Sequence, residues 1–384
     1  MWEFGPDSDL ADPANSSAEM GVILSKPLIA RLQNGKFVVI FGNGYNSASQ
    51  KAQLVILDAE DGSVIRVIDT FAGSLSNANG LAEPFLIDLD RDRVVDYAYA
   101  GDLLGNMWKF DLTDSNPANW GVALSGQPLF TAKDANGNVQ QITSKPAVAT
   151  NDSGGINVLF GTGKYFEIGD NIIPSNPAVD SFYSIQDIGA AVGMNRSALV
   201  QQEILAELDV LDANNNVVNE ARVTSDATVD YSQSNGWYID LITPADPASG
   251  SSAAAEGERV IVRPEVRFGR VIFATFTPSA NPCSAGGDGW IMVLDATSGA
   301  RNQNAVIDIN GDGNINITDN LNFAGNDVAG SGLSTGGGTG DLLVVNGGDF
   351  DSVFIQDNDG GDPDRVDLLG AGDQAGRQSW RQIQ

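Results

Sequence analysis

The chain has 384 residues and a formal net charge of −29, because 50 acidic residues outnumber 21 lysines and arginines. This negative charge argues against nucleic acid and anionic membrane surfaces as partners, since both need a basic footprint. The absence of histidine and the single cysteine exclude Ser-His-Asp and Cys-His nucleophile systems, histidine-ligated zinc and an internal disulfide. Cys283 is a buried or loop thiol, or it pairs with a cysteine elsewhere in a longer parent chain.

Neither end of the chain carries a membrane or export signal. No apolar run approaches the ~18 residues that a transmembrane helix needs. Residues 1–6 lack the basic and apolar regions of a signal peptide. We therefore expect a soluble chain that is a fragment of a longer protein.

Short strand-like runs recur along the chain and predict its fold. The 44 glycines, the Asp-Gly and Asn-Gly pairs and the β-branched runs indicate many strands joined by tight turns. Successive copies of the pattern open at Lys26-Pro27, Glu83-Pro84, Lys145-Pro146 and Arg263-Pro264. Four-stranded units at spacings of roughly 50 to 100 residues are typical of propeller blades with insertions. We predict an all-β fold in which residues 1–384 form one β-propeller domain of about six or seven blades.

Three stretches depart from the repeating pattern. Residues 245–258 and 328–340 are rich in small residues and are expected to be mobile loops. Residues 195–208 carry enough Leu, Ile, Glu and Gln for a short amphipathic helix, although a strand pair inserted in a blade would carry similar residues. Further strands are expected at residues 341–345, 352–356 and 379–383.

An acidic loop lies between two strand-like runs within residues 85–112. Its carboxylates occupy positions 1, 3, 5 and 9, which are Asp88, Asp90, Asp92 and Asp96. Oxygens at this spacing suit calcium, which takes six to eight oxygen ligands, and the carbonyl of Val94 at position 7 is a further ligand. Position 12 is Tyr99, so Asp96 must complete the shell and the exit segment is free to be a strand. The alternative is an acidic surface turn, in which the four acids would repel one another by on the order of several kcal/mol.

One feature bears on how strongly calcium is held. Position 6 of such a loop usually carries a glycine with positive φ, and here it is Arg93, so we expect a modest affinity.

A second candidate loop spans residues 308–319. Its expected ligands at positions 1, 3, 5, 7 and 12 are Asp308, Asn310, Asp312, Asn314 and Asp319. Position 6 is Gly313, so this loop matches the EF-hand pattern more closely, with a plain Asx turn as the alternative.

Several motifs occur together along the chain. They are Tyr-Ala-Gly-Asp-Leu-Leu-Gly-Asn-Met-Trp-Lys-Phe-Asp-Leu at 99–112, Phe-Gly-Asn-Gly-Tyr-Asn at 41–46, Phe-Gly-Thr-Gly-Lys-Tyr at 160–165, Gly-Glu-Arg-Val at 257–260 and Ser-Trp-Arg at 379–381. From about Ser25 onward the chain resembles the C-terminal β-propeller domain of the PilY/PilC family of type IV pilus tip and assembly proteins. The loop at 88–96 falls where the acidic loop of that family lies.

The resemblance implies a function at the outer membrane and pilus tip of a Gram-negative bacterium. It implies contacts with pilus components such as minor pilins, and a role in assembling the fibre, in countering its retraction and in twitching. It also implies adhesion to host or abiotic surfaces, with calcium as a switch between these roles. The sequence contains no Arg-Gly-Asp tripeptide, so integrin binding of that kind is not implied.

Two other function classes compete with a non-enzymatic pilus module. The turns at 57–62 and 294–299 resemble the blade-closing turns of quinoprotein dehydrogenases, but that class is expected to hold a vicinal cysteine pair over its quinone. An integrin-like or lectin-like extracellular propeller would share the succession of strand, calcium loop and strand. We predict that the chain is not an enzyme.

Overall fold

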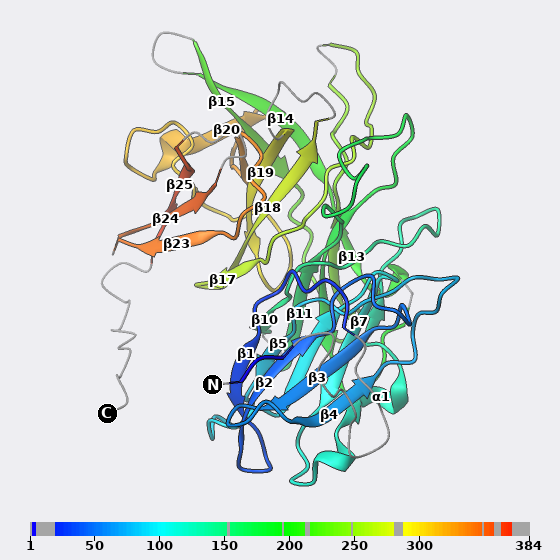
Figure 1. Ribbon diagram of the computed structural model, residues 1–384. Helices are drawn as coiled ribbons and strands as arrows, with labels where there is room; N and C mark the ends of the chain where they lie inside the picture. Colours follow the sequence, from blue (N-terminus) through cyan, green and yellow to red (C-terminus); the bar gives the residue numbers. More distant parts are fainter. Residues whose placement is uncertain are drawn as a thin grey trace.

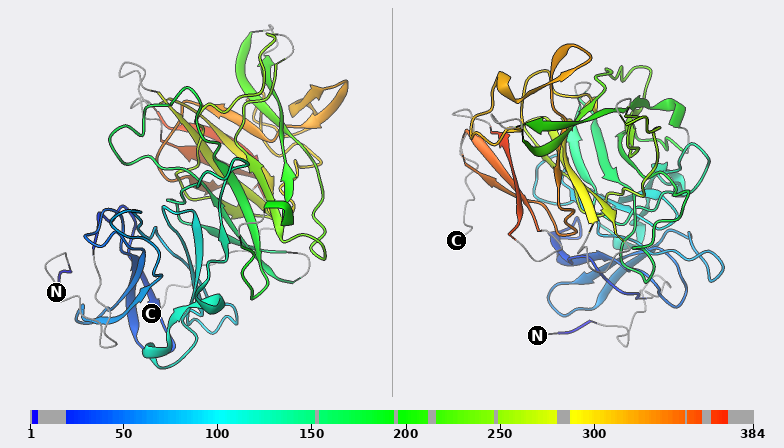
Figure 2. Two further views of the ribbon diagram at one scale, coloured as in Figure 1. Left: turned by 90° about the vertical axis from the view of Figure 1, so that its right-hand side faces the viewer. Right: turned by 90° about the horizontal axis from the view of Figure 1, so that it is seen from above.

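The structure is a computed structural model that describes residues 2–4, 20–151, 154–193, 196–211, 216–246, 249–279, 287–347, 349–356 and 362–370. The described chain folds mainly into antiparallel sheets (Figure 1). Five of these sheets have three or more strands, and they follow one another around the molecule (Figure 2).

The first sheet is a four-stranded meander in which each strand pairs with the next. Its strands are β1 (Leu28–Arg31), β2 (Phe37–Gly42), β3 (Gln53–Asp58) and β4 (Val64–Asp69). Every residue of β3 is buried, because this strand lies inside the sheet and is rich in Leu, Val and Ile.

The second and third sheets repeat this plan. The second contains β5 (Phe85–Ile87), β6 (Tyr97–Gly101), β7 (Asn106–Asp111), β8 (Gly121–Val122) and β9 (Phe130–Thr131), with the turns η1 (Pro117–Asn119) and α1 (Ala123–Gly126) beside β8. The third contains β10 (Ala147–Thr150), β11 (Ile156–Gly161), β12 (Ser181–Asp187) and β16 (Gly236–Asp240), and β13 (Val200–Gln202) adds parallel to β16 after the turn η2 (Arg196–Ala198).

The fourth sheet is the largest, and its strand order departs from the order along the chain. From one edge to the other it contains β17 (Glu265–Arg267), β18 (Arg270–Pro278), β19 (Gly287–Asp295), β22 (Gly332–Thr335), β15 (Val217–Thr224) and β14 (Ile204–Leu211). The fifth sheet contains β23 (Leu343–Asn346), β24 (Phe350–Ile355) and β25 (Asp364–Leu369). The turn η3 (Ile317–Asp319) leads into a separate hairpin of β20 (Asn320–Phe323) and β21 (Asn326–Ala329).

Two expectations about the interrupted stretches are wrong. The helix expected at residues 195–208 is absent, because β13 and β14 occupy most of this segment, and β14 pairs with β15. The loop expected at residues 328–340 contains β22, which lies between β15 and β19. At Gly332 the side chain of Met292 packs closely on the strand, and a Cβ atom at this position would lie 2.5 Å from the methionine sulfur. The strand expected at 379–383 and Cys283 lie outside the described residues.

A charged residue stands two positions before an edge strand of each of the five sheets, namely β1, β5, β10, β17 and β23. These residues are Lys26, Glu83, Lys145, Arg263 and Asp341. The four Pro-containing repeat openings predicted from the sequence therefore each lead into an edge strand of one of the first four sheets. Ion pairs join Lys26 to Asp341 at 2.6 Å and Lys145 to Glu83 at 3.0 Å, so the first sheet is connected to the fifth and the second to the third.

The apolar core is divided between the sheets. One buried cluster joins the fourth and fifth sheets and includes Ile291, Val353 and Val366. Another joins the first two sheets and includes Ile56, Trp108 and Phe110. Within the described part of the chain, no helix has the length and apolar composition needed to cross a membrane.

Candidate metal centre

The first acidic loop, residues 88–96, connects β5 to β6 and is organised by Asp88. One carboxylate oxygen of Asp88, Oδ1, accepts the backbone N–H groups of Arg91 at 2.7 Å and Asp92 at 3.2 Å. The other oxygen, Oδ2, accepts the N–H of Arg93 at 2.7 Å. The carboxylate therefore holds the turn while the remaining lone pair of Oδ2 is free for a ligand.

The other carboxylates of the loop extend this pattern. Asp90 Oδ1 accepts the N–H of Asp92 at 3.1 Å, and Asp92 Oδ1 accepts the N–H of Val94 at 2.7 Å. Asp96 Oδ2 reaches back to the N–H of Leu89 at 2.8 Å and so closes the loop. β6 begins directly after Asp96, as the strand expected at the exit requires.

Asp88, Asp90 and Asp96 come together. Each of them offers a carboxylate oxygen, and these atoms all lie within 4.8 Å of one another. Asp92 does not belong to this group of three. Among the residues that the structure describes, this is the one group of three or more Asp, Glu, His or Cys side chains whose ligand atoms approach so closely. Their oxygens are the hard donors that calcium takes.

The proximity of these acids affects the ionisation of Asp90. The N–H of Asp92 lowers the pKa of Asp90, but reduced hydration and the carboxylates of Asp92, Asp96 and Asp88 outweigh it, and the net pKa is raised. Like charges at short range disfavour the ionised form, and a bound cation reverses this effect.

Two arginines in the loop hold an unusual backbone conformation. Arg93 has φ of 72°, which confirms the expectation from its place at position 6, and Arg91 at position 4 has φ of 65°. The left-handed region costs a side-chain-bearing residue roughly 1 to 2 kcal/mol. Arg91 was missed by sequence reasoning, although the second loop gives a signal, since its position 4 is Gly311.

The second acidic loop, residues 308–319, repeats the backbone pattern of the first. Asp308 Oδ1 accepts the N–H groups of Gly311 at 2.8 Å and Asp312 at 3.2 Å, and its Oδ2 accepts that of Gly313 at 2.8 Å. Gly311 and Gly313 have φ of 71° and 79°, so glycines stand where the first loop carries arginines.

The remaining positions of the second loop also correspond. Asn310 Oδ1 accepts the N–H of Asp312 at 2.9 Å, and Asp312 Oδ1 accepts that of Asn314 at 2.7 Å. Asp319 Oδ1 accepts the N–H of Ile309 at 2.9 Å and closes the loop as Asp96 does in the first. Burial raises the pKa of Asp308, against the N–H groups that stabilise its charge.

Each loop is fastened to a strand of a neighbouring sheet. In the first loop the N–H of Val95 donates to the carbonyl of Arg31, the last residue of β1, at 3.0 Å. In the second loop the N–H of Asp308 donates to the carbonyl of Asp367 in β25 at 2.9 Å. Both candidate sites therefore lie at a junction between sheets.

Comparison with known proteins identifies the family. A family model described as the PilY1 beta-propeller domain matches residues 1–218, which is more than half of the chain. The chain belongs to the PilY1 β-propeller domain family. The resemblance drawn from the motifs and the predicted β-propeller fold class are thereby confirmed, whereas the predicted number of blades is not.

Relatives and a solved structure agree with this assignment. The type IV pilus biogenesis factor PilY1 homolog of Xylella fastidiosa is 35% identical over 78% of this chain and 20% of its own length. The type IV pilus biogenesis factor PilY1 of Pseudomonas aeruginosa PAO1 is 32% identical over 90% of this chain and 31% of its own length. The crystal structure of the Pseudomonas aeruginosa PilY1 C-terminal domain has 29% identity and a TM-score of 0.78, over 91% of this chain and 72% of that one.

These matches set the scope of the assignment. The chain is a homologue of type IV pilus biogenesis factors, a family of non-enzymatic proteins, and the prediction that it is not an enzyme is confirmed. It spans about a fifth to a third of the length of the curated relatives.

Proposed function

We propose that the chain is a calcium-binding module of a type IV pilus biogenesis factor. It works outside the cytoplasm, at the outer membrane and pilus tip. Calcium regulates the balance between pilus extension and retraction, and with it twitching and adhesion. Membership of the PilY1 family supports the pilus function. The observation that carries the calcium proposal is the close group of Asp88, Asp90 and Asp96 within a hydrogen-bonded turn. In addition, a second loop of the same chain repeats that turn.

In the first loop, the carboxylates of Asp88, Asp90 and Asp96 are the proposed ligands, with Asp92 and the carbonyl of Val94 completing the shell. Calcium supplies a positive charge that offsets the repulsion among these acids. The side chains of the loop hold the turn through their backbone hydrogen bonds, so little of the site has to form when the ion arrives. The second loop is proposed as a further site, with Asp308, Asn310, Asp312, Asn314 and Asp319 as ligands.

Calcium binding has a direct test in the purified 384-residue chain. An ion that binds the folded state and hardly the unfolded state stabilises folding by about 2.7 kcal/mol at one hundred times its dissociation constant. We therefore expect the melting temperature to rise with added calcium and to fall with a chelator. Isothermal titration calorimetry gives the number of sites and the affinity. Failure to detect any calcium binding at millimolar concentrations would remove the calcium proposal and leave the family assignment intact.

Asp96→Asn tests the first loop while keeping a side chain of similar size at position 96. Asparagine keeps an oxygen that can accept the N–H of Leu89, but it removes one ligand charge. The calcium-induced rise in melting temperature should fall, and the remaining response should vanish when Asp312→Ala is added. Asp61→Asn is the matched control, because Asp61 is an exposed acid whose side chain only holds the turn at Ser63. An unchanged calcium response in Asp96→Asn would contradict the ligand assignment.

A test of the role in the pilus requires the full-length gene. In a piliated bacterium that lacks its own copy, the gene carrying Asp96→Asn should support surface pili and twitching that respond less to calcium, and adding Asp312→Ala should abolish the response. Capture of purified minor pilins by the chain would support a pilus partner, whereas binding of fluorescent glycans in their place would favour the lectin-like alternative.

A further inference from the structure

A pocket with a volume of about 410 Å³ is lined by the chain segments that lead into an edge strand of each of the five sheets. Its walls include residues that directly precede β1, β5, β10, β17 and β23, so every large sheet contributes to it. A volume in this range accommodates a small organic ligand. Neither acidic loop contributes a residue to its lining.

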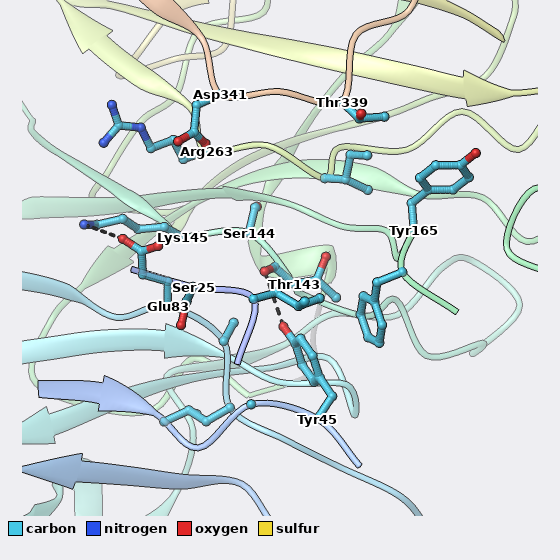
Figure 3. A pocket seen from close by; sticks show the side chains of 16 residues that line it. Ser25, Tyr45, Glu83, Thr143, Ser144, Lys145, Tyr165, Arg263, Thr339 and Asp341 are labelled. Carbon is cyan, nitrogen blue, oxygen red and sulfur yellow. Dashed lines mark hydrogen bonds and ion pairs between the residues drawn. The ribbon is translucent and has the colours of Figure 1, made fainter. Parts of the chain in front are cut away.

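The two ends of the pocket differ in chemistry (Figure 3). Glu83, Lys145, Arg263 and Asp341 gather at one end, and Tyr45 and Tyr165 lie toward the other (Figure 3). The aromatic end is firmly built: the ring of Tyr45 stacks on that of Phe166 with 4.4 Å between centroids. The ring of Tyr165 meets Phe276 edge-on at 4.8 Å.

The acceptors at the charged end are already engaged. Glu83 accepts from the ammonium of Lys145 at 3.0 Å and from the backbone N–H of Lys26 at 3.1 Å. Asp341 accepts from the ammonium of Lys26 at 2.6 Å. A cationic ligand would therefore have to break existing ion pairs before it could use these carboxylates.

Donors, in contrast, remain available. The Nε atom of Arg263 is buried and has no hydrogen-bond partner among the described residues, while another nitrogen of its guanidinium pairs with Glu265 at 2.7 Å. The hydroxyl of Ser144, a residue that is only 4% exposed, is likewise buried without a partner. Buried polar atoms of this kind normally find a partner in a folded protein. Both residues line the pocket, and a rotation of either side chain would present its unpaired donor to an acceptor placed there.

We propose that this pocket binds a small organic acid, with its carboxylate held by Arg263 and Ser144 and its apolar body against Tyr45 and Tyr165. The cations and carboxylates that line the pocket balance in charge, so the proposed carboxylate is held by hydrogen bonds to specific donors and not by a positive field. The guanidinium group suits a carboxylate because it offers several N–H groups in one plane.

The test compares an acid with its neutral counterpart. The 384-residue chain is titrated with 3-phenylpropionate and with 3-phenylpropionamide, and binding is followed by calorimetry and by changes in the NMR spectrum. We expect saturable binding of the acid and at least tenfold weaker binding of the amide, because the amide lacks the charge that strengthens the hydrogen bonds. Equal binding of the two probes, or no saturable binding of the acid at millimolar concentrations, would overturn the proposal.

Variants then locate the bound carboxylate. Arg263→Gln and Ser144→Ala should each weaken binding of the acid, the arginine change by about tenfold or more, and leave the already weak binding of the amide unchanged. Arg365→Gln is the control, since Arg365 is an exposed arginine of β25 that pairs with Asp367 and does not line the pocket. If Arg263→Gln bound the acid as tightly as the parent chain while keeping its melting temperature, the ligand would lie elsewhere and the proposal would fail.

Discussion

Arg91 and Arg93 hold backbone conformations that Gly311 and Gly313 hold at the corresponding positions of the second acidic loop. The hydrogen bonds to Asp88 nevertheless form in the same way. The first loop therefore keeps its shape at an energetic cost that the second loop avoids. It also carries two positive charges beside the proposed cation, and these oppose its binding.

Two substitutions at Arg93 separate backbone strain from charge. Arg93→Gly removes both, and Arg93→Gln removes the charge while a side chain remains in the left-handed region. We expect calcium to bind more tightly to both variants and most tightly to Arg93→Gly, whose advantage over Arg93→Gln should be about fivefold if the bound conformation costs a side-chain-bearing residue roughly 1 kcal/mol of strain. Calorimetry gives the dissociation constants. If Arg93→Gln bound calcium as tightly as Arg93→Gly, charge alone would account for the effect.

Asp180 gives the chain a pH dependence that does not involve the acidic loops. Although the residue keeps some exposed surface, its carboxyl group is enclosed by protein, and burial raises its pKa to about 6, against a hydrogen bond from Thr162. The folded state therefore holds a proton that the unfolded state has already released between about pH 4 and pH 6. This contribution to stability is present at the acidic end of that window and is lost as the pH rises through 6.

Asp180→Asn should remove this contribution. In a chelator, the melting temperature of the variant should rise relative to the parent chain as the pH increases from about 4 to 7. Asp230→Asn is the control, because Asp230 is an exposed acid whose pKa is lowered by hydrogen bonds from Ser232. Parallel curves for Asp180→Asn and the parent chain would show that Asp180 ionises normally.

At the scale of the strand pair, β14 and β15 place Glu207 directly opposite Arg222. Arg222 is 1% exposed and also makes two hydrogen bonds to Glu258, at 2.6 and 2.8 Å. Its guanidinium lies 4.1 Å from the ring centroid of Trp290 in β19. One buried arginine therefore joins β15, β19 and the segment that contains the Gly-Glu-Arg-Val motif.

Glu258→Ala should destabilise the chain by about 3 to 5 kcal/mol, because it leaves the buried Arg222 short of a counter-ion. Combining Glu258→Leu with Arg222→Met and Glu207→Gln should recover much of this loss, since the variant removes Arg222 together with both carboxylates that pair with it. Urea unfolding curves give both values. Glu256→Ala, an exposed acid two residues away, should change stability by less than about 0.5 kcal/mol. A small effect of Glu258→Ala would mean that Glu207 alone suffices as partner.

An element can be predicted from the sequence when the residues that determine it lie close together in the chain. An edge strand of each of the first four sheets was predictable because a proline beside a charged residue leads into it. The 88–96 loop was predictable because its acids lie within nine residues. β22 was missed because its Gly- and Ser-rich sequence has little strand propensity, and its place is set by β15 and β19, which are distant in the chain. The 195–208 segment was misread because its apolar residues fit a helix as well as a strand, and only the pairing of Glu207 with Arg222 decides between them.

For the whole molecule, we propose that the described sheets form one domain. The ion pair between Lys26 and Asp341 joins sheets whose residues are 315 positions apart, and an apolar cluster joins the fourth and fifth sheets. Small-angle scattering should therefore show a single compact particle, with or without calcium. Two well-separated lobes would contradict this proposal.

The strand order of the fourth sheet has a consequence for the time course of synthesis. β14 and β15 leave the ribosome long before β22, yet β15 reaches the rest of its sheet only through β22, which is completed at Thr335. Until then the hairpin presents an open edge, and such edges recruit other chains. Its exposed tip residues Leu211, Val217 and Val218 add to this hazard. The nascent chain is thus most vulnerable to mispairing between about residues 224 and 335, and a chaperone that covers sheet edges would be needed during that interval more than before or after it.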